Sequence, residues 1–230
     1  MSALLRGLVV SLALAAPAGA QECNFSAGPP ADWRRMDTPA MSLYLPPDAY
    51  AKDISSDHST THRFLADGVD VLIDYGLASQ LKFDESGAVS RLLGGSPASV
   101  LTEVGDRGGG RIGAGWSHLG PQQRLAASLS IRVGDAAHWD DACRIAASVR
   151  LLGDVSQLTL LRIGKTDGGQ RFAEVVGSDA RKRRLFVGDY ASLNWGRISA
   201  IDSAAIVITE LLRGDDGGYT QRQTRLERQR

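Results

Sequence analysis

The 230-residue sequence has few of the side chains that carry redox, metal or nucleophilic chemistry. It holds two cysteines and four histidines, and neither a Cys-x-x-Cys pair nor a Gly-x-Ser-x-Gly motif is present. A thiol redox site and a hydrolase built on a nucleophile elbow therefore have no support in the sequence. The 26 basic residues are balanced by 26 acidic ones, so the net charge gives no reason to expect binding to nucleic acid or to an anionic membrane.

A sustained apolar run is also missing, except within the first twenty residues. Arg6 gives a positive start, Leu8–Ala16 carries no charge, and Ala18-Gly19-Ala20 offers the small residues at which signal peptidase cuts. The run is short for a bilayer core of about 30 Å, so a retained membrane anchor is the weaker alternative. We expect residues 1–20 to be a secretory signal peptide and Gln21 to begin an exported, periplasmic chain without a further membrane span.

Both cysteines, Cys23 and Cys143, follow the expected cleavage site. An oxidising compartment favours their pairing, and closing so long a loop stabilises a fold by about 4–5 kcal/mol in the chain-entropy model. The alternative is two unrelated free thiols. Cys23 does not complete a lipoprotein signal, because Ala20-Gln21-Glu22 before it lacks the apolar and small residues of such a signal.

The segment 21–152 shows strand periodicity followed by one helical segment. Strands are expected over Met41–Leu45, within Phe64–Tyr75, and over Ser99–Val104, Arg111–Trp116 and Leu125–Val133. Apolar positions at helical spacing predict a helix within Asp135–Val149, with Asp140 and Asp141 near its start, where the helix dipole favours acidic residues. We therefore expect an α+β domain, an antiparallel sheet with a late helix, that ends near Leu152.

The segment 153–230 has a different pattern of apolar and turn residues. Five short apolar runs are separated by turns rich in Gly and Asp: Gln157–Gly164, Arg171–Val176, Arg183–Val187, Gly196–Ile201 and Ala205–Leu212. Regularly spaced short strands of this kind predict a small all-β domain, a sandwich or a barrel.

Two motifs have the residue spacing of ligand-binding sites. Gly108, Gly110 and Gly113 have dinucleotide-loop spacing, but a strand-like stretch follows instead of the helix such a loop requires, so we expect a glycine-rich hairpin. His58 and His62, with Asp57 beside them, have metal-ligand spacing, but hydroxyl residues surround them and no third ligand is near. We expect a polar surface loop there, with no metal and no cofactor.

A basic run, Arg181-Lys182-Arg183-Arg184, leads into one of the C-terminal apolar runs. Such a run contacts an acidic partner or a phosphate in some proteins, and in others it is a solvated hairpin. Both readings stay open at the level of charge alone.

Short segments in the C-terminal part follow one another in a distinctive order. They are Leu160-Leu161-Arg162-Ile163-Gly164, Gly169-Gln170-Arg171-Phe172-Ala173, Val187-Gly188-Asp189-Tyr190, Asn194-Trp195-Gly196-Arg197-Ile198, Ile208-Thr209-Glu210-Leu211 and Gly217-Gly218-Tyr219, with Arg222 and Leu226 in the last strand. This series, over about Gln157–Leu226, resembles the β-domain of the PilP family of type IV pilus assembly proteins. It is similar more loosely to the periplasmic domain of the type II secretion C protein.

The resemblance implies a docking domain without catalytic groups. Its implied partners are proteins, namely the outer-membrane secretin and the inner-membrane pilus alignment proteins. The implied partner-binding residues are Val187, Gly188, Asp189, Tyr190, Asn194, Trp195, Gly196 and Arg197, with Arg181, Lys182, Arg183 and Arg184 steering an acidic partner. Gly188 is expected at a positive φ, and Gly196 at a close approach of two strands.

The N-terminal part departs from that family, whose members usually carry a lipobox and a long flexible N-terminal segment. Here this part is expected to fold, and the chain is expected not to be an enzyme. Two alternatives place a site in the N-terminal domain: an exported enzyme, for which Asp57, His58 and His62 are the best candidates, and an envelope protein that binds a ligand.

Overall fold

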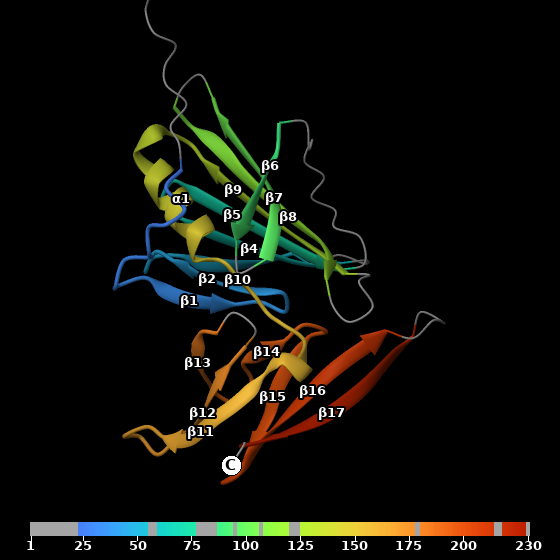
Figure 1. Cartoon of the computed structure of the whole chain (residues 1–230). Helices are drawn as coiled ribbons and strands as arrows, with labels where there is room; N and C mark the ends of the chain where they lie inside the picture. Colours follow the sequence, from blue (N-terminus) through green and yellow to red (C-terminus); the bar gives the residue numbers. More distant parts are fainter. Residues whose placement is uncertain are drawn as a thin grey trace, which may run out of the picture.

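The computed structural model describes residues 23–54, 59–76, 87–93, 96–105, 108–119, 125–177, 180–213 and 218–228. The expected signal peptide and Gln21 lie outside these residues. The described chain is mostly antiparallel β-sheet with one short α-helix, which confirms a β-rich fold (Figure 1). None of the helices in the described ranges has the length and hydropathy needed to cross a membrane.

The largest sheet has seven antiparallel strands in the spatial order β3-β4-β5-β9-β8-β7-β6. Its strands are β3 (Tyr50–Ile54), β4 (Ser59–Ala66), β5 (Val69–Gly76), β6 (Val89–Leu93), β7 (Ser96–Val104), β8 (Gly110–Leu119) and β9 (Leu125–Val133). Alternation decides which face is buried, because successive side chains of a strand point to opposite faces. Val71, Ile73, Ile112, Leu129 and Ile131 are almost fully buried on one face.

That buried face is covered by a helix and a small sheet. The helix α1 (Trp139–Ser148) follows the 3-10 turn η1 (Ala136–His138) and contacts both β2 and the β8–β9 pair. The small sheet has the order β1-β2-β10. Its strands are β1 (Arg34–Asp37), β2 (Met41–Leu45) and β10 (Arg150–Leu151).

The C-terminal part begins with the 3-10 turn η2 (Val155–Gln157) and contains two further sheets, drawn in orange and red in Figure 1. One has the order β11-β12-β13 and the other the order β14-β15-β16-β17. Their strands are β11 (Thr159–Lys165), β12 (Arg171–Val176), β13 (Lys182–Leu185), β14 (Tyr190–Ser192), β15 (Gly196–Ile201), β16 (Ala205–Arg213) and β17 (Tyr219–Glu227). Buried residues of both sheets form one cluster that includes Leu160, Val175, Leu185, Ile198 and Ile206.

Most strands with clear alternation were predicted correctly. β2, β9 and β15 have the expected bounds, β7 and β8 form the expected hairpin, and α1 lies inside the expected helical segment. The turn between β7 and β8 contains Gly108 at φ +77°, and Gly113 lies within β8, so the hairpin interpretation is confirmed and no helix opens there. The arrangement of an α+β domain followed by a sandwich stays a prediction.

Several strands were missed, and one expectation was wrong. β1, β3, β6, β10 and β14 were not expected at all. The polar loop expected at His58–His62 is wrong for its second half, because β4 begins at Ser59 and His62 pairs with Ile73 of β5. Asp57 and His58 lie outside the described residues.

The expected disulfide is present. Cys23 and Cys143 are bonded, with 5.2 Å between their Cα atoms and 120 residues between them along the chain. Cys143 is a buried residue of α1, so the bond fixes the segment before β1 to the helix that covers the large sheet.

Candidate protein-docking surface

The turn Phe186–Tyr190, which contains the predicted docking residues Val187–Tyr190, is tightly closed. The carboxylate of Asp189 accepts a hydrogen bond from the Phe186 N–H at 2.8 Å, and the Asp189 N–H donates to the Phe186 carbonyl at 3.1 Å. Gly188 has φ +97°, as expected from the sequence, and its N–H donates to the carbonyl of Ile198 at 2.8 Å. These bonds leave Val187 as an exposed apolar tip.

Tyr190 and Arg197 face each other across the β14–β15 pair. The Arg197 guanidinium lies 4.2 Å from the centre of the Tyr190 ring and donates to its hydroxyl. This cation–π contact orders two side chains at the surface beside the turn.

Two other predicted docking residues, Asn194 and Trp195, make contacts within the chain. Asn194 is buried and donates its N–H to the Tyr75 hydroxyl at 3.3 Å, and Trp195 donates its indole N–H to Thr60 at 3.0 Å. The Trp195 and Tyr75 rings lie 5.1 Å apart. Burial raises the pKa of Tyr75, so its hydroxyl stays a neutral partner for Asn194. These residues join the C-terminal part to the seven-stranded sheet.

Gly196, next to Trp195, is needed for close packing, as expected. A Cβ atom at Gly196 would lie 2.0 Å from the Ser192 hydroxyl. Ser192 in turn donates to Glu210 at 3.3 Å, and the fully buried carboxylate of Glu210 pairs with Arg222 at 2.7 Å. Sequence reasoning missed Glu210 and Arg222 as supports of this loop, since an acid in β16 and an arginine in β17 meet only through strand register.

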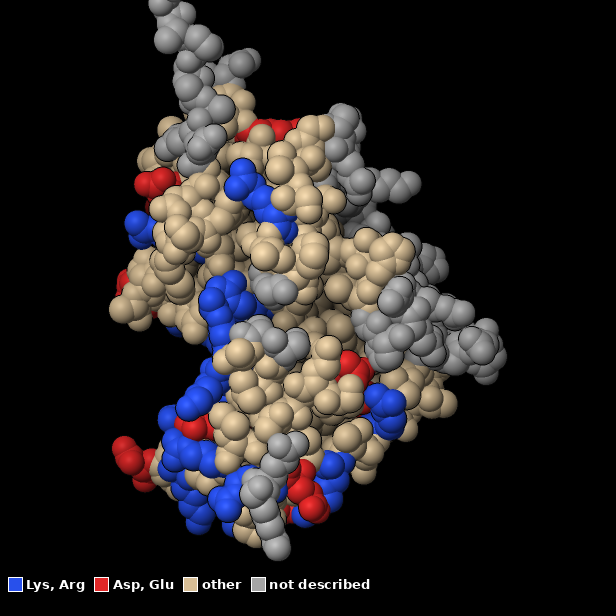
Figure 2. Space-filling model, viewed as in Figure 1, with Lys and Arg blue, Asp and Glu red and all other residues tan. Residues whose placement is uncertain are grey.

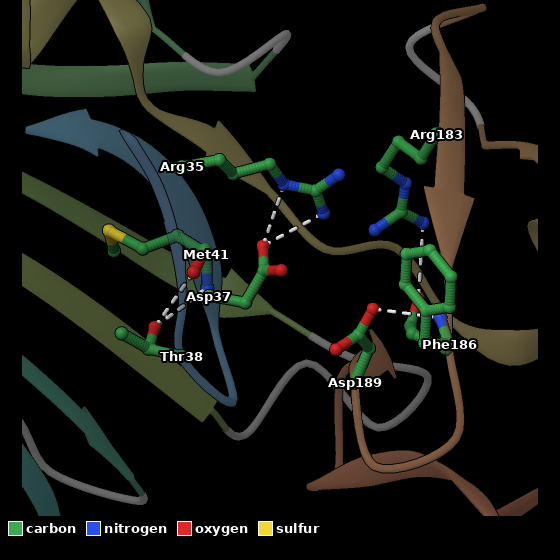
Figure 3. A network of polar contacts seen from close by, with 8 residues as sticks. Arg35, Asp37, Thr38, Met41, Arg183, Phe186 and Asp189 are labelled. Carbon is green, nitrogen blue, oxygen red and sulfur yellow. Dashed lines mark hydrogen bonds and ion pairs between the residues drawn. The ribbon is translucent and has the colours of Figure 1, made fainter. Parts of the chain in front are cut away.

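Figure 3 shows a second junction between the two parts of the chain, where Arg183 and Asp189 lie opposite Arg35 and Asp37 of β1. Arg183 donates to the carbonyl of Ala191 at 3.1 Å, and Arg35 pairs with Asp37 at 2.8 Å. Burial raises the pKa of Asp37, the charge of Asp189 adds to this effect, and the two arginines oppose it. Arg183 and Asp189 therefore face the N-terminal part.

In contrast to Arg183, the other two basic residues of β13, Lys182 and Arg184, are exposed. The Arg184 guanidinium lies 4.2 Å from the centre of the Phe172 ring and 3.4 Å from the Glu174 carboxylate. Arg162 of β11 binds the same carboxylate with two hydrogen bonds, at 2.6 and 2.7 Å.

These contacts build an ordered basic face. The hydrogen bonds from Arg162, and then the contact with Arg184, lower the pKa of Glu174 to about 2, so this carboxylate is charged at neutral pH. Two arginines thus share one acid over a buried phenylalanine, which leaves positive charge in excess. In Figure 2, Lys and Arg side chains gather over the part of the surface formed by β11–β13. We name the outward surface of Arg162, Lys182 and Arg184 the β13 face.

The β13 face also ends in a strand edge. Within the described sheets β13 pairs with β12 and with no other strand. The opposite edge strand, β11, is bridged to Arg228 after β17 at Leu160, so its edge is partly covered. An uncovered edge presents backbone N–H and C=O groups to which an extended segment of another protein can add.

Within the described ranges, no group of three His, Cys, Asp or Glu side chains is placed to hold a metal ion. His62 of β4 lies beside Phe64, with 6.5 Å between the ring centres.

Comparison with known proteins found no matching family model and no matching curated protein. Solved structures of PilP proteins are similar to part of the chain. A domain of the type IV pilus biogenesis lipoprotein PilP from Pseudomonas aeruginosa is 24% identical over 32% of this chain and 83% of that one, with a TM-score of 0.30. PilP from Pseudomonas aeruginosa, solved in solution, is 23% identical over 34% and 68%, with a TM-score of 0.31. A domain of the Neisseria meningitidis PilP pilot protein is 24% identical over 33% and 65%, with a TM-score of 0.29.

Proposed function

We propose that this chain is an exported, non-enzymatic docking component of an envelope assembly, a type IV pilus or a related secretion machine. The C-terminal part would bind a protein partner, and a secretin or a pilus alignment protein is the class of partner that we propose. The ordered series of segments over Gln157–Leu226 supports this setting. Type IV pilus biogenesis is also the role named for a solved PilP protein similar to about a third of the chain.

The observation that carries the proposal is the β13 face, where an open strand edge and excess positive charge coincide. Arg181, Lys182 and Arg184 are exposed along or beside this edge, and Glu174 is the acid that two arginines already share. A strand edge gives affinity through backbone hydrogen bonds, and surrounding charge steers an oppositely charged partner. The partner segment is therefore extended and acidic.

We divide the proposed docking residues according to the contacts that each makes. Val187 is exposed at the tip of the turn that follows β13 in the chain. Asn194, Trp195 and Gly196 are assigned to contacts within the chain, as are Arg183 and Asp189. We propose that Val187 and the β13 face contact the partner directly. The five residues with contacts inside the chain would support this surface.

The test is a crosslinking pull-down from native cell envelopes with the tagged chain, read by mass spectrometry. The double variant Lys182→Glu/Arg184→Glu reverses charge on the β13 face. The control, Lys52→Glu/Arg91→Glu, makes the same change at exposed positions of β3 and β6 on the large sheet.

We expect the wild type and the control to recover a secretin or an alignment protein, and the β13-face variant to lose it. The recovered amount should fall as salt rises, because exposed charges are screened at distances beyond about 10 Å in 0.1 M salt. Equal recovery by the two double variants would show that the partner binds elsewhere, provided that both variants keep the wild-type thermal midpoint.

A ligand-binding envelope protein is the second candidate function, and a specific pocket of the large sheet favours it. The two functions belong to different parts of the chain and do not compete.

A further inference from the structure

A pocket of about 160 Å³ lies on the face of the seven-stranded sheet opposite to the one that carries the core. It is lined by residues of β4, β5 and β9: Arg63, Asp70, Leu72, Ser130 and Arg132. The neighbouring residues Val69, Val71 and Ile131, which point the other way, are buried in the core. The pocket is therefore separate from the β13 face, and nothing in the proposed docking role uses it.

The charges around the pocket do not balance. Arg63 holds both oxygens of Asp70, at 2.8 and 2.7 Å, so the one acid among the described lining residues of the pocket is already neutralised. Arg132 is exposed, and none of the ion pairs found between described residues includes it. The pocket thus has a guanidinium with its donors available.

A second arginine adds to this excess. Arg111 of β8 is the direct cross-strand neighbour of Arg132, and like charges at such opposed positions destabilise a sheet. On its far side Arg111 is paired in register with Glu103 of β7, which lies one strand farther from the pocket. A sheet that keeps Arg111 and Arg132 side by side has a place for an anion between β5 and β8.

Ser130 supplies a neutral donor at the same place. It is 3% exposed, and its hydroxyl oxygen accepts a hydrogen bond from Arg111 Nε at 3.1 Å. With its oxygen engaged in this way, the Ser130 O–H can donate into the pocket that it lines. A guanidinium and a hydroxyl that line the same pocket beside a neutralised acid are suited to a carboxylate, which accepts two hydrogen bonds at once.

The remaining wall and the size restrict the group that carries the carboxylate. Leu72 gives the pocket an apolar wall. A cavity of about 150 Å³ holds a molecule the size of benzene, whereas drug-sized ligands need about 300 Å³ or more. We propose that this pocket binds a carboxylate carried by a small apolar group, such as an aryl or short alkyl acid, with Arg132 and Ser130 as its hydrogen-bond donors.

The same chemistry occurs in a free organic acid and at the C-terminus of a peptide that ends in an apolar residue. Both are tested on the full exported chain by NMR titration of the arginine Nε–Hε signals. The probes are benzoate, its neutral analogue benzamide, inorganic phosphate, and a tetrapeptide with a free C-terminal phenylalanine.

We expect benzoate or the peptide to bind saturably, to shift the Arg132 signal, and to bind more strongly than benzamide and phosphate. Whichever of the two binds identifies the source of the carboxylate. Arg132→Gln should weaken this binding about tenfold or more, because a hydrogen bond between charged groups is lost. Arg144→Gln on α1 is the matched control, since it removes the same charge away from the pocket.

Arg132→Gln relieves the repulsion from Arg111 but also removes the attraction to Asp70, the cross-strand neighbour on β5, so its thermal midpoint should stay close to that of the wild type. A loss of binding at an unchanged thermal midpoint is not due to unfolding, and Ser130→Ala should give a second, smaller loss of binding. The proposal is overturned if neither carboxylate binds saturably, if phosphate binds as strongly as both, or if Arg132→Gln and Arg144→Gln behave alike. None of these results bears on the β13 face.

Discussion

Glu174 shows how single contacts order the surface of the C-terminal part. Arg162 and Arg184 bind its carboxylate from the two neighbouring strands and also lie over the ring of Phe172, at 5.4 and 4.2 Å from its centre. Each guanidinium is thus held by an acid and by an aromatic ring. The two arginines are fixed in position before a partner arrives, which lowers the side-chain entropy lost on binding.

This arrangement makes stability depend on pH. The pKa of Glu174 is lowered to about 2 in the fold, against about 4.3 in an unfolded chain. A lowered pKa stabilises the fold above the unfolded value, and this contribution is lost as the pH falls from about 4.3 to about 2. Urea unfolding followed across this range should show a flatter pH dependence for Glu174→Gln than for the wild type.

The pH dependence of Glu174→Gln should be reduced but not abolished. Asp202 also has a pKa lowered to about 2, by the N–H groups of Ala204 and Ala205 and by Arg225. Asp202→Asn is therefore the matched variant. It should remove a separate part of the pH dependence of stability in the same pH range. If Glu174→Gln and the wild type had parallel profiles, the carboxylate would not be held as the structure shows.

At the scale of elements, the sequence predicts strands well where apolar and polar residues alternate along the strand itself. β9 and β15 show this alternation. The helix α1 is indicated by a change from strand to helical periodicity at Trp139. β17 has almost no buried side chains, so its sequence carries no alternation, and its nine residues are strand because each is paired with β16. β4 was missed for a similar reason, since its first residues are polar and their structure comes from register with β5.

The candidate sites likewise contain features that depend on local sequence and features that depend on residues far along the chain. The turn at Gly188 and the close approach at Gly196 could be predicted, because glycine is the residue that such local geometry requires. The inward direction of Asn194 and Trp195 could not, since it depends on Tyr75 and Thr60, more than a hundred residues away. The pocket beside Arg132 was likewise missed, because its walls come from three strands that only the sheet brings together.

The disulfide is the feature that should matter most for the element α1. It joins Cys143 of this helix to a segment 120 residues earlier, and closing so long a loop restricts the unfolded chain. Replacing both cysteines by serine should lower the free energy of unfolding by about 4–5 kcal/mol in the chain-entropy model. Urea unfolding of the double variant, compared with the wild type in the presence and absence of reductant, measures this loss.

Reduced wild type and the double serine variant should agree, because both lack the same cross-link. A double variant that unfolds at the same urea concentration as the oxidised wild type would contradict the expectation. Loss of the bond should leave the C-terminal cluster around Leu160 and Ile206 in place, since neither cysteine contacts it.

At the scale of the whole molecule, two junctions hold the C-terminal part against the N-terminal part. One is the charged junction of Arg35, Asp37, Arg183 and Asp189, and the other is built on Trp195. Leu193 adds to the second, since it is buried with the N-terminal core and its N–H donates to the carbonyl of Gly153 at 2.9 Å. The two parts have separate clusters of buried residues, so these junctions decide whether they unfold together.

Trp195 is the contact whose loss should separate the two parts. Its ring packs between Tyr75 and Tyr219, at 5.1 and 6.4 Å, and its N–H is bonded to Thr60. Truncating a fully buried tryptophan costs about 3–5 kcal/mol, and Trp195 is only partly buried, so Trp195→Ala should cost about 2–3 kcal/mol. Calorimetry should then show two resolved transitions, where the wild type shows one.

Trp195→Phe is the control that distinguishes coupling from simple destabilisation. It keeps an aromatic ring beside Tyr75 but removes the indole donor, so it should lower the thermal midpoint less and preserve a single transition. A single transition in Trp195→Ala, merely shifted to lower temperature, would mean that the charged junction alone couples the two parts. Combining Trp195→Ala with Arg183→Ala would then be needed to separate them, because Arg183 is the residue of the C-terminal part whose charge attracts Asp37 across the junction.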